Sequence, residues 1–295
     1  MAEKKDIDQV SGIETTGHSW DDIKELNNPL PKWWLWTFYG TVIWALLYTI
    51  AYPAWPMVTQ ATSGVLGYSS RQNVVEAMAE HRERFAPLTD RIAAMDIEEV
   101  AQDQELMQFA LAGGAAVFRA HCSQCHGSGA AGGVGYPNLN DDEWLWGGTR
   151  AQIEQTIAHG IRWDADPETR FSEMPAFGQE ELLDETQIKQ VVEFVWSLSN
   201  PEGADTDLTV PGSEVFADNC ASCHGDDAMG IADLGAPNLT DGIWLYGGDR
   251  DTLRQTVMYS RRGVMPSWLG RLTEAEVRKV ALYVHNRGGG VEAGE

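Results

Sequence analysis

The sequence predicts an all-α protein in which a single N-terminal transmembrane helix precedes two tandem helical domains. Three observations lead to this expectation. Residues 33–52 contain no charged side chain, the pattern C-x-x-C-H occurs twice in the second half of the chain, and an apolar stretch with helical spacing follows each copy, at 188–198 and 277–286. The length of 295 residues suits about two domains of roughly 100–200 residues each.

The uncharged run at 33–52 is long enough to cross a bilayer, because twenty helical residues span about 30 Å of hydrocarbon. Pro53 and Pro56 then end the helix. Aromatic side chains flank the run at both ends, as at membrane interfaces: Trp33, Trp34, Trp36, Tyr52 and Trp55. A buried core helix is the disfavoured alternative, since no polar face is visible. A cleavable signal peptide is also disfavoured, because no small-residue cleavage site follows the run.

The charges around this run predict its orientation. Lys24 and Lys32 precede it, whereas no cation follows it before Arg71. The positive-inside rule therefore places the N-terminus in the cytoplasm and the chain from about residue 57 outside, in a bacterial inner membrane with the later domains in the periplasm. The expected segments are a cytoplasmic tail at 1–32, a transmembrane anchor at 33–56 and a periplasmic helical tether at 57–108.

The chain is strongly acidic, with 21 Lys and Arg against 44 Asp and Glu and a net charge of −23. The acidic residues are spread along the whole chain, which argues against nucleic acid and anionic lipid as ligands. The composition suits a basic protein partner. Solubility alone is an equally good explanation of the charge.

The second half of the chain repeats itself. AVFRAHCSQCHG at 116–127 matches EVFADNCASCHG at 214–225, and later matches in each copy are PNL, WL(W/Y)GG and Met-Pro. The repeat predicts two domains, at 109–200 and 212–291, joined by a linker at 201–211.

The C-x-x-C-H pattern is the attachment signature of c-type haem, with two cysteines for the porphyrin vinyl groups and a histidine for the iron. The predicted covalent attachment residues and proximal iron ligands are Cys122, Cys125 and His126 for one haem, and Cys220, Cys223 and His224 for the other. A zinc site would unite both cysteine pairs in one cluster, and a thioredoxin-like dithiol would need a βαβ context. The zinc site is disfavoured because each pair belongs to its own repeat, and the dithiol because no βαβ context is visible.

The sixth iron ligand is expected from the repeated Met-Pro. Met174 and Met265 stand on proline-fixed loops at matching places in the two copies. A thioether is a soft axial ligand, and His/Met ligation raises the potential of a haem. His159 competes with Met174 at the first iron, although its counterpart in the second copy is Tyr259.

Short N-terminal helices are expected to begin each domain, and Gly212-Ser213 is a cap signal near the start of the second. Phe118 and Phe216 are expected to face the C-terminal helices, near Trp196 and Tyr283.

The two domains resemble class I cytochromes c, which implies an all-α fold around each haem. In that class a proline carbonyl accepts a hydrogen bond from the proximal histidine, a role that falls to Pro137 and Pro237. Arg150 and Arg250 beside the W-L-x-G-G segments are candidates to neutralise haem propionates, and a simple surface role for them stays open.

The whole chain resembles one family more closely. The specific features are PKWWLWTFYGTVIWALLYTIAYPAWP at 31–56 and TSGVLGYSSR at 62–71, followed by two C-x-x-C-H domains. This order is similar to the dihaem subunit, subunit III or the P subunit, of cbb3-type cytochrome c oxidases. The resemblance covers nearly the full length.

The resemblance implies a non-catalytic electron relay with two covalent haem c groups. A basic donor cytochrome c would supply electrons, which would pass to a monohaem cytochrome c subunit and then to the haem–copper subunit that reduces oxygen. The family pattern pairs His126 with Met174 and His224 with Met265. The alternatives are a free-standing membrane-anchored dihaem carrier or dehydrogenase subunit, and a dihaem peroxidase. The peroxidase would need an open iron position, which two Met-Pro loops disfavour.

Overall fold

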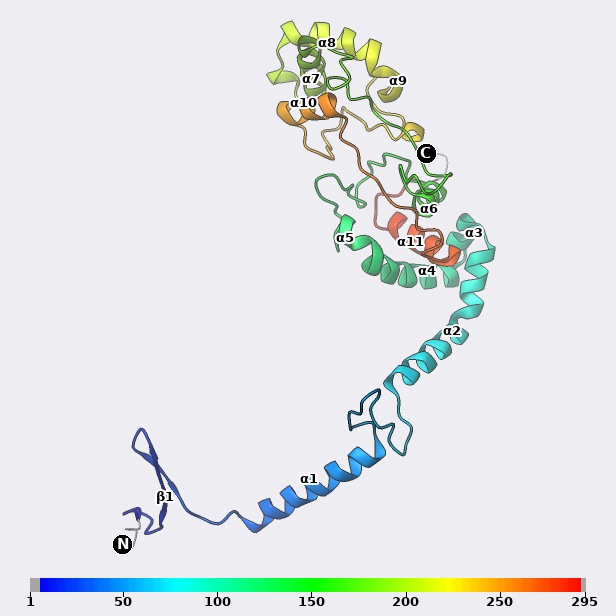
Figure 1. Cartoon of the computed structure of the whole chain (residues 1–295). Helices are drawn as coiled ribbons and strands as arrows, with labels where there is room; N and C mark the ends of the chain where they lie inside the picture. Colours follow the sequence, from blue (N-terminus) through cyan, green and yellow to red (C-terminus); the bar gives the residue numbers. More distant parts are fainter. Residues whose placement is uncertain (1–5, 293–295) are drawn as a thin grey trace. The chain divides into compact units, whose positions relative to one another are not determined.

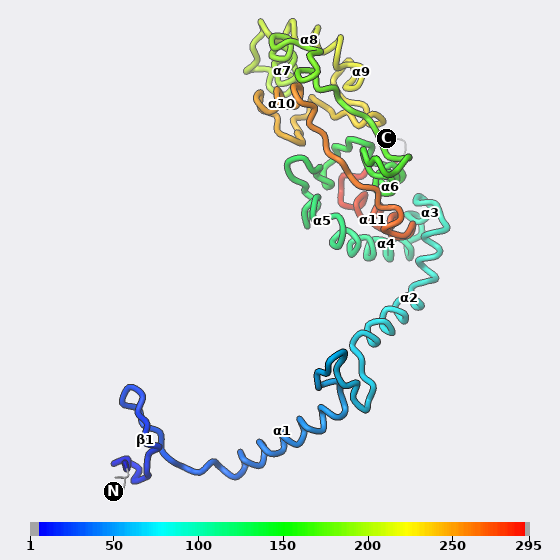
Figure 2. The backbone as a smooth tube through the Cα atoms, viewed as in Figure 1, coloured from blue at the N-terminus to red at the C-terminus, as the bar shows by residue number. Residues whose placement is uncertain are grey.

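The computed structural model describes residues 6–292, and its contacts divide the chain into two compact units that meet between Glu83 and Arg84. Figures 1 and 2 show helices connected by long loops, with one hairpin near the N-terminus.

The first unit contains the predicted apolar helix and one element that the sequence did not predict. This element is an antiparallel hairpin of β1 (Thr15–Trp20) and β2 (Ile23–Leu26). Helix α1 (Lys32–Ala51) buries none of its residues within the protein, and it is long and apolar enough to cross a membrane. The chain after it folds back, with the amide of Val65 donating to the carbonyl of Ile50 at 2.9 Å.

Helix α2 (Ser70–Ala94) contains the boundary between the units, and α3 (Ile97–Gln102) and α4 (Gln104–Val117) follow it. Asp103 ends α3 and begins α4, where its carboxylate accepts from the amides of Glu105 and Leu106 at 3.0 and 3.1 Å. An acceptor at this position satisfies amides that have no partner inside the helix. The expected tether is therefore helical from Ser70 onward.

The remaining helices build the two C-x-x-C-H regions. They are the π-helical turn η1 (Phe118–Cys122), α5 (Ser123–His126), α6 (Arg150–His159), α7 (Glu185–Ser199), the 3₁₀ turns η2 (Pro201–Gly203) and η3 (Ala232–Leu234), α8 (Thr206–Asn219), α9 (Ala221–His224), α10 (Arg250–Tyr259) and α11 (Glu274–His285).

The terminal helices of the two repeats are exchanged. Helix α4, which opens the first repeat, packs against α11, which closes the second, whereas α7 packs against α8. Figure 1 shows α11 alongside α4 and α7 alongside α8. We call α3–α6 with α11 the first helix group, and α7–α10 the second helix group. The second group is contiguous in sequence, and the first group is completed by the chain that returns after it.

Two glycines explain how closely these helices approach. A Cβ atom on Gly114 would collide with the backbone of Lys279 on α11, and one on Gly212 would collide with the backbone of Gln190 on α7. Gly114 and Gly212 each stand four residues before the phenylalanine of their repeat. The same small residue therefore forms the crossing point in both groups.

The second repeat begins its first helix earlier than expected, so the predicted linker at 201–211 and the predicted cap at Gly212-Ser213 are wrong. Helix α8 begins at Thr206, because Asp205 caps it and accepts from the amide of Asp207 at 3.0 Å. Most of the expected linker at 201–211 is therefore helical, and Gly212-Ser213 lies inside the helix. Gly212 is needed for the approach of α7, not for a helix start.

Each group has its own apolar core. Phe118 is 1% exposed in the first core and lies 5.6 Å from the ring of Tyr283. Phe216 is 3% exposed in the second core and lies 5.3 Å from the ring of Phe194. Both phenylalanines face a C-terminal helix as expected, but each of these helices comes from the other repeat.

Candidate haem-binding sites

The first C-x-x-C-H sequence occupies the turn from η1 into α5. Nδ1 of His126 lies 3.2 Å from the carbonyl oxygen of Pro137, the arrangement expected of a proximal histidine. Burial lowers the pKa of His126 and favours the neutral imidazole. When Nδ1–H donates a hydrogen bond to the Pro137 carbonyl, Nε2 keeps its lone pair free to bind an iron.

The second C-x-x-C-H sequence repeats this geometry on α9. Nδ1 of His224 lies 3.1 Å from the carbonyl oxygen of Pro237, and the histidine is 9% exposed. Burial lowers the pKa of His224 as well. The two histidines are thus oriented in the same way by equivalent prolines.

The cysteines lie in two separate places. Cys122 packs against the first core and Cys220 against the second. Burial raises the pKa of each of these thiols to about 11. A reactive dithiol would have a lowered pKa, so these sites suit thioether attachment better than thiol redox chemistry.

Met265 packs against the first core, together with Cys122. Its backbone pairs with Ile161, just after α6, through N–O distances of 3.0 and 2.9 Å. Two residues further on, the buried hydroxyl of Ser267 donates to the carbonyl of Ala158 at 2.7 Å. The second Met-Pro loop is therefore fixed along α6 of the first helix group.

Met174 packs against the second core, together with Cys220. The hydroxyl of Ser260, at the end of α10, donates to the carbonyl of Met174. The amide of Gln179 donates to the carbonyl of Met258 at 3.0 Å. The first Met-Pro loop is therefore fixed along α10 of the second helix group.

This placement corrects the expected pairing within each repeat. The structure brings Met265, not Met174, to the core that holds Cys122, and Met174, not Met265, to the core that holds Cys220. The physical reason is the helix exchange, since each Met-Pro loop leads directly into the C-terminal helix of its repeat. That helix carries the loop to the other group.

His159 is occupied by carboxylates. Its Nδ1 lies 3.3 Å from Asp166, and its Nε2 lies 3.2 Å from Glu168. Both ring nitrogens have partners on the loop that follows α6, which disfavours an iron-ligand role.

The two arginines expected near haem propionates have protein partners. Arg150 pairs with Glu98 at 2.8 Å and also with Glu292. Arg250 pairs with Glu193 at 2.6 Å, and its guanidinium carbon lies 3.4 Å from the centre of the Trp196 ring. Their positive charge is already used to join segments of the protein.

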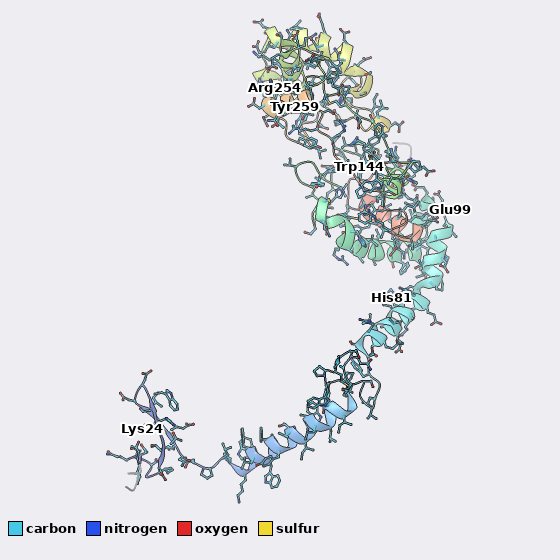
Figure 3. The ribbon with its side chains drawn as sticks, in the orientation of Figure 1. Lys24, His81, Glu99, Trp144, Arg254 and Tyr259 are labelled. Atoms are coloured by element: carbon cyan, nitrogen blue, oxygen red, sulfur yellow. The ribbon has the colours of Figure 1, made fainter. Side chains whose placement is uncertain are left out.

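The surface where the two helix groups meet was not predicted from the sequence. The amide of Gly135 donates to the carbonyl of Leu245 at 2.8 Å. A Cβ atom on Gly135 would meet the ring of Tyr246, and one on Gly235 would meet the ring of Trp146. The repeated W-L-x-G-G segment was the available signal, because its third residue supplies both rings. Figure 3 labels Trp144, from the first of these segments, and Arg254 and Tyr259 on α10.

Known families match both the N-terminal segment and the two C-x-x-C-H regions of the chain. Residues 12–59 match the family described as the N-terminal domain of cytochrome oxidase-cbb3, FixP, and residues 109–195 and 208–284 match cytochrome C oxidase, cbb3-type, subunit III. The cbb3-type cytochrome c oxidase subunit CcoP of Cereibacter sphaeroides is 56% identical over 94% of this chain and 95% of its own. The cbb3-type cytochrome c oxidase subunit FixP of Sinorhizobium medicae is 53% identical over 98% of this chain and 100% of its own.

Proposed function

The chain belongs to the family of cbb3-type cytochrome c oxidase subunit III and is an electron-transfer subunit of that oxidase, and from this premise we propose that it carries two covalent haems c with exchanged methionine ligands. The first haem is attached to Cys122 and Cys125, and the second to Cys220 and Cys223. Their iron ligands are His126 with Met265, and His224 with Met174.

One observation carries this proposal, namely that each C-x-x-C-H region shares its core with the methionine of the other repeat. The fit to the cofactor is chemical as well. Each site offers two thiols, a neutral imidazole fixed by a proline carbonyl and a thioether, which is a complete donor set for a six-coordinate haem c.

When bound, the haems supply a reversible one-electron couple, and the protein determines how they are held. Pro137 and Pro237 orient the two imidazoles and increase their basicity as ligands. The buried side chains of the two cores exclude water from the haem surroundings. The thioethers of Met174 and Met265 favour a high potential. With a histidine and a methionine for each iron, neither haem would keep an open position, so the chain would transfer electrons and leave oxygen reduction to the haem–copper subunit.

The membrane arrangement follows from the anchor and the flanking charges. Helix α1 anchors the chain in the bacterial inner membrane. The tail that contains Lys24 and Lys32 faces the cytoplasm, and the haem-bearing helix groups face the periplasm. A basic donor cytochrome c reduces the chain, and electrons pass on to the monohaem subunit and the haem–copper subunit.

Mild-detergent purification from native membranes tests this function. The chain should co-purify with a copper-containing subunit and a second haem c subunit, and pyridine haemochrome analysis of the isolated chain should give two haems. A chain that purifies without copper would instead be a free-standing dihaem carrier. A chain without covalent haem would overturn the proposal.

A further inference from the structure

Three arginines at the meeting of the two helix groups differ from the other arginines of the haem-bearing region. Arg162, Arg170 and Arg261 are half-buried, and among residues 6–292 none of them forms an ion pair with a carboxylate. Their neighbours Arg150, Arg250 and Arg262 all do. A half-buried cation without an anion is unexpected in a chain of charge −23.

Arg170 lies against the first helix group. Its guanidinium carbon is 5.7 Å from the centre of the Trp146 ring, and Nη2 donates to the Gln152 carbonyl at 3.4 Å and to Gln155 at 3.0 Å. Its Nε is buried and has no hydrogen-bond partner in the described protein. Burial also lowers the pKa of Arg170. The Nε and Nη1 donors are thus left for a group that the protein does not supply.

Arg261 lies in the same way against the second helix group. Its guanidinium carbon is 4.8 Å from the centre of the Tyr246 ring. Nη2 donates to the Thr252 carbonyl at 2.7 Å, and Nε and Nη2 both donate to the Thr256 hydroxyl oxygen, at 3.0 and 2.5 Å, which leaves Nη1 as the donor without a partner in the described protein. Tyr246 and Thr252 are the counterparts of Trp146 and Gln152 in the repeat. The protein therefore builds the same arginine–aromatic–helix arrangement twice, once on α6 and once on α10.

The two arginines also hold equivalent places in the sequence. Arg170 stands four residues before Met174, and Arg261 stands four residues before Met265. Each arginine packs on the helix group of its own repeat, whereas the methionine that follows enters the core of the other group. Four extended residues span about 13 Å. Each R-x-x-x-M-P segment thus connects one haem site with the other.

From this geometry, and on the basis of the proposed haem sites, we propose that Arg170 and Arg261 bind haem propionates. Arg170 binds a propionate of the haem on His126, and Arg261 binds a propionate of the haem on His224. A guanidinium offers a planar fork of donors that matches a carboxylate. Haem propionates are carboxylates that each site would acquire only with its cofactor, which accounts for the unused donors, Nε and Nη1 of Arg170 and Nη1 of Arg261. Each R-x-x-x-M-P segment then contacts both haems: its arginine binds a propionate of one haem, and its methionine binds the iron of the other.

The test uses full-length chain with both haems and the variants Arg170→Gln and Arg261→Gln. A cation beside a haem favours the reduced state, so its loss should raise the oxidised-to-reduced ratio about tenfold at a fixed ambient potential. Arg170→Gln should have this effect on the first haem alone, and Arg261→Gln on the second alone. Redox difference infrared spectra with ¹³C-labelled propionates should show a shifted carboxylate band at the same haem.

The matched controls are Arg271→Gln and Arg254→Gln. Arg271 is exposed and lies 5.6 Å from the Trp268 ring, and Arg254 on α10 pairs with Glu185. Neither control should change a haem potential or a propionate band. Variants that match their controls in both readouts would overturn the proposal, as would an effect of Arg170→Gln on the second haem alone.

The variants Arg170→Lys and Arg261→Lys decide the result if a glutamine variant loses haem. Lysine keeps the charge but not the fork, so the potential should be largely restored and the propionate band should remain shifted. An unshifted band in the lysine variants would overturn the proposal. Haem analysis separates this outcome from failure of the proposed function, which would appear as a wild-type chain without two haems.

Discussion

The ring of Phe118 lies 5.6 Å from the ring of Tyr283, although the two residues belong to different sequence repeats. The contact places the last helix of the chain beside the first C-x-x-C-H region. The second phenylalanine, Phe216, has the matching contact with Phe194 in the other core. The exchange of C-terminal helices therefore determines which methionine packs against the core of each C-x-x-C-H region.

The close helix crossing at Gly114 should be sensitive to a single methyl group. Gly114→Ala forces the backbone of α11 away from α4, and we expect the free energy of unfolding of the first helix group to fall by about 1–3 kcal/mol. Urea titration followed by the Soret band of the first haem measures this loss.

Gly113→Ala is the matched control for Gly114→Ala. Its added Cβ would meet Cδ of the Lys279 side chain at 3.0 Å and no backbone atom of α11, while alanine improves helix propensity by up to about 1 kcal/mol. This variant should be neutral or stabilising. Equal destabilisation by both substitutions would contradict the crossing.

Glu143 should make stability depend on pH near neutrality. Burial and the carboxylate of Asp241 raise the pKa of Glu143 to about 7, so the folded state binds a proton that the unfolded state has released above about pH 4.5. Stability from this group is therefore lost as the pH rises from about 4.5 to 7.

Glu143→Gln should remove that loss. Because Glu143 is only partly buried, solvent screening weakens the effect. We expect the free energy of unfolding to rise by on the order of 1 kcal/mol at pH 8 and to change little at pH 5. Thermal unfolding at both pH values measures the difference, with Glu202→Gln, at an exposed carboxylate away from Glu143, as the control. A gain of the same size at pH 5 would refute the titration of Glu143.

The contiguous second helix group should fold as a separate cytochrome. A fragment of residues 166–262, exported and loaded with haem, contains Met174, His224 and helices α7–α10. It should show the methionine-to-iron charge-transfer band. The second sequence repeat alone, residues 201–295, lacks α7 and Met174 and should not show this band. A band in the 201–295 fragment and none in the 166–262 fragment would show that the histidine and methionine ligands of a haem come from the same repeat.

The acidic surface near the second haem should attract a basic donor. Asp226 and Asp227 are both exposed beside the second C-x-x-C-H sequence, whereas Asp141 in the first repeat is partly buried. Stopped-flow reduction by a basic cytochrome should slow steeply as salt rises from about 10 to 200 mM. Asp226→Lys with Asp227→Lys should slow it further at low salt. A larger effect of Asp141→Lys with Asp142→Lys would make the first haem the site at which electrons enter.

Local patterns predicted most of the individual parts. The apolar run predicted α1, and C-x-x-C-H with a following proline predicted the geometry of His126 and His224. These signals lie within a few residues of one another, so the sequence alone contains them.

The pairing of the parts could not be predicted in this way. Both repeats have a Met-Pro loop, an apolar C-terminal helix and a glycine at the crossing, so α4 could accept either α7 or α11. Gly114 and Gly212 are the same residue in equivalent positions, and the sequence pattern therefore does not distinguish the two arrangements. The choice depends on tertiary packing around each core, as does the ion pairing that engages Arg150 and Arg250.

The most direct test of the exchanged ligands uses a chain with one haem. Cys122→Ala with Cys125→Ala removes the first attachment site and leaves the haem on His224, whose methionine-to-iron charge-transfer band can then be measured alone. Adding Met174→His should abolish this band and lower the potential of the remaining haem, whereas adding Met265→His should leave both unchanged. Loss of the band with Met265→His and its survival with Met174→His would contradict the account.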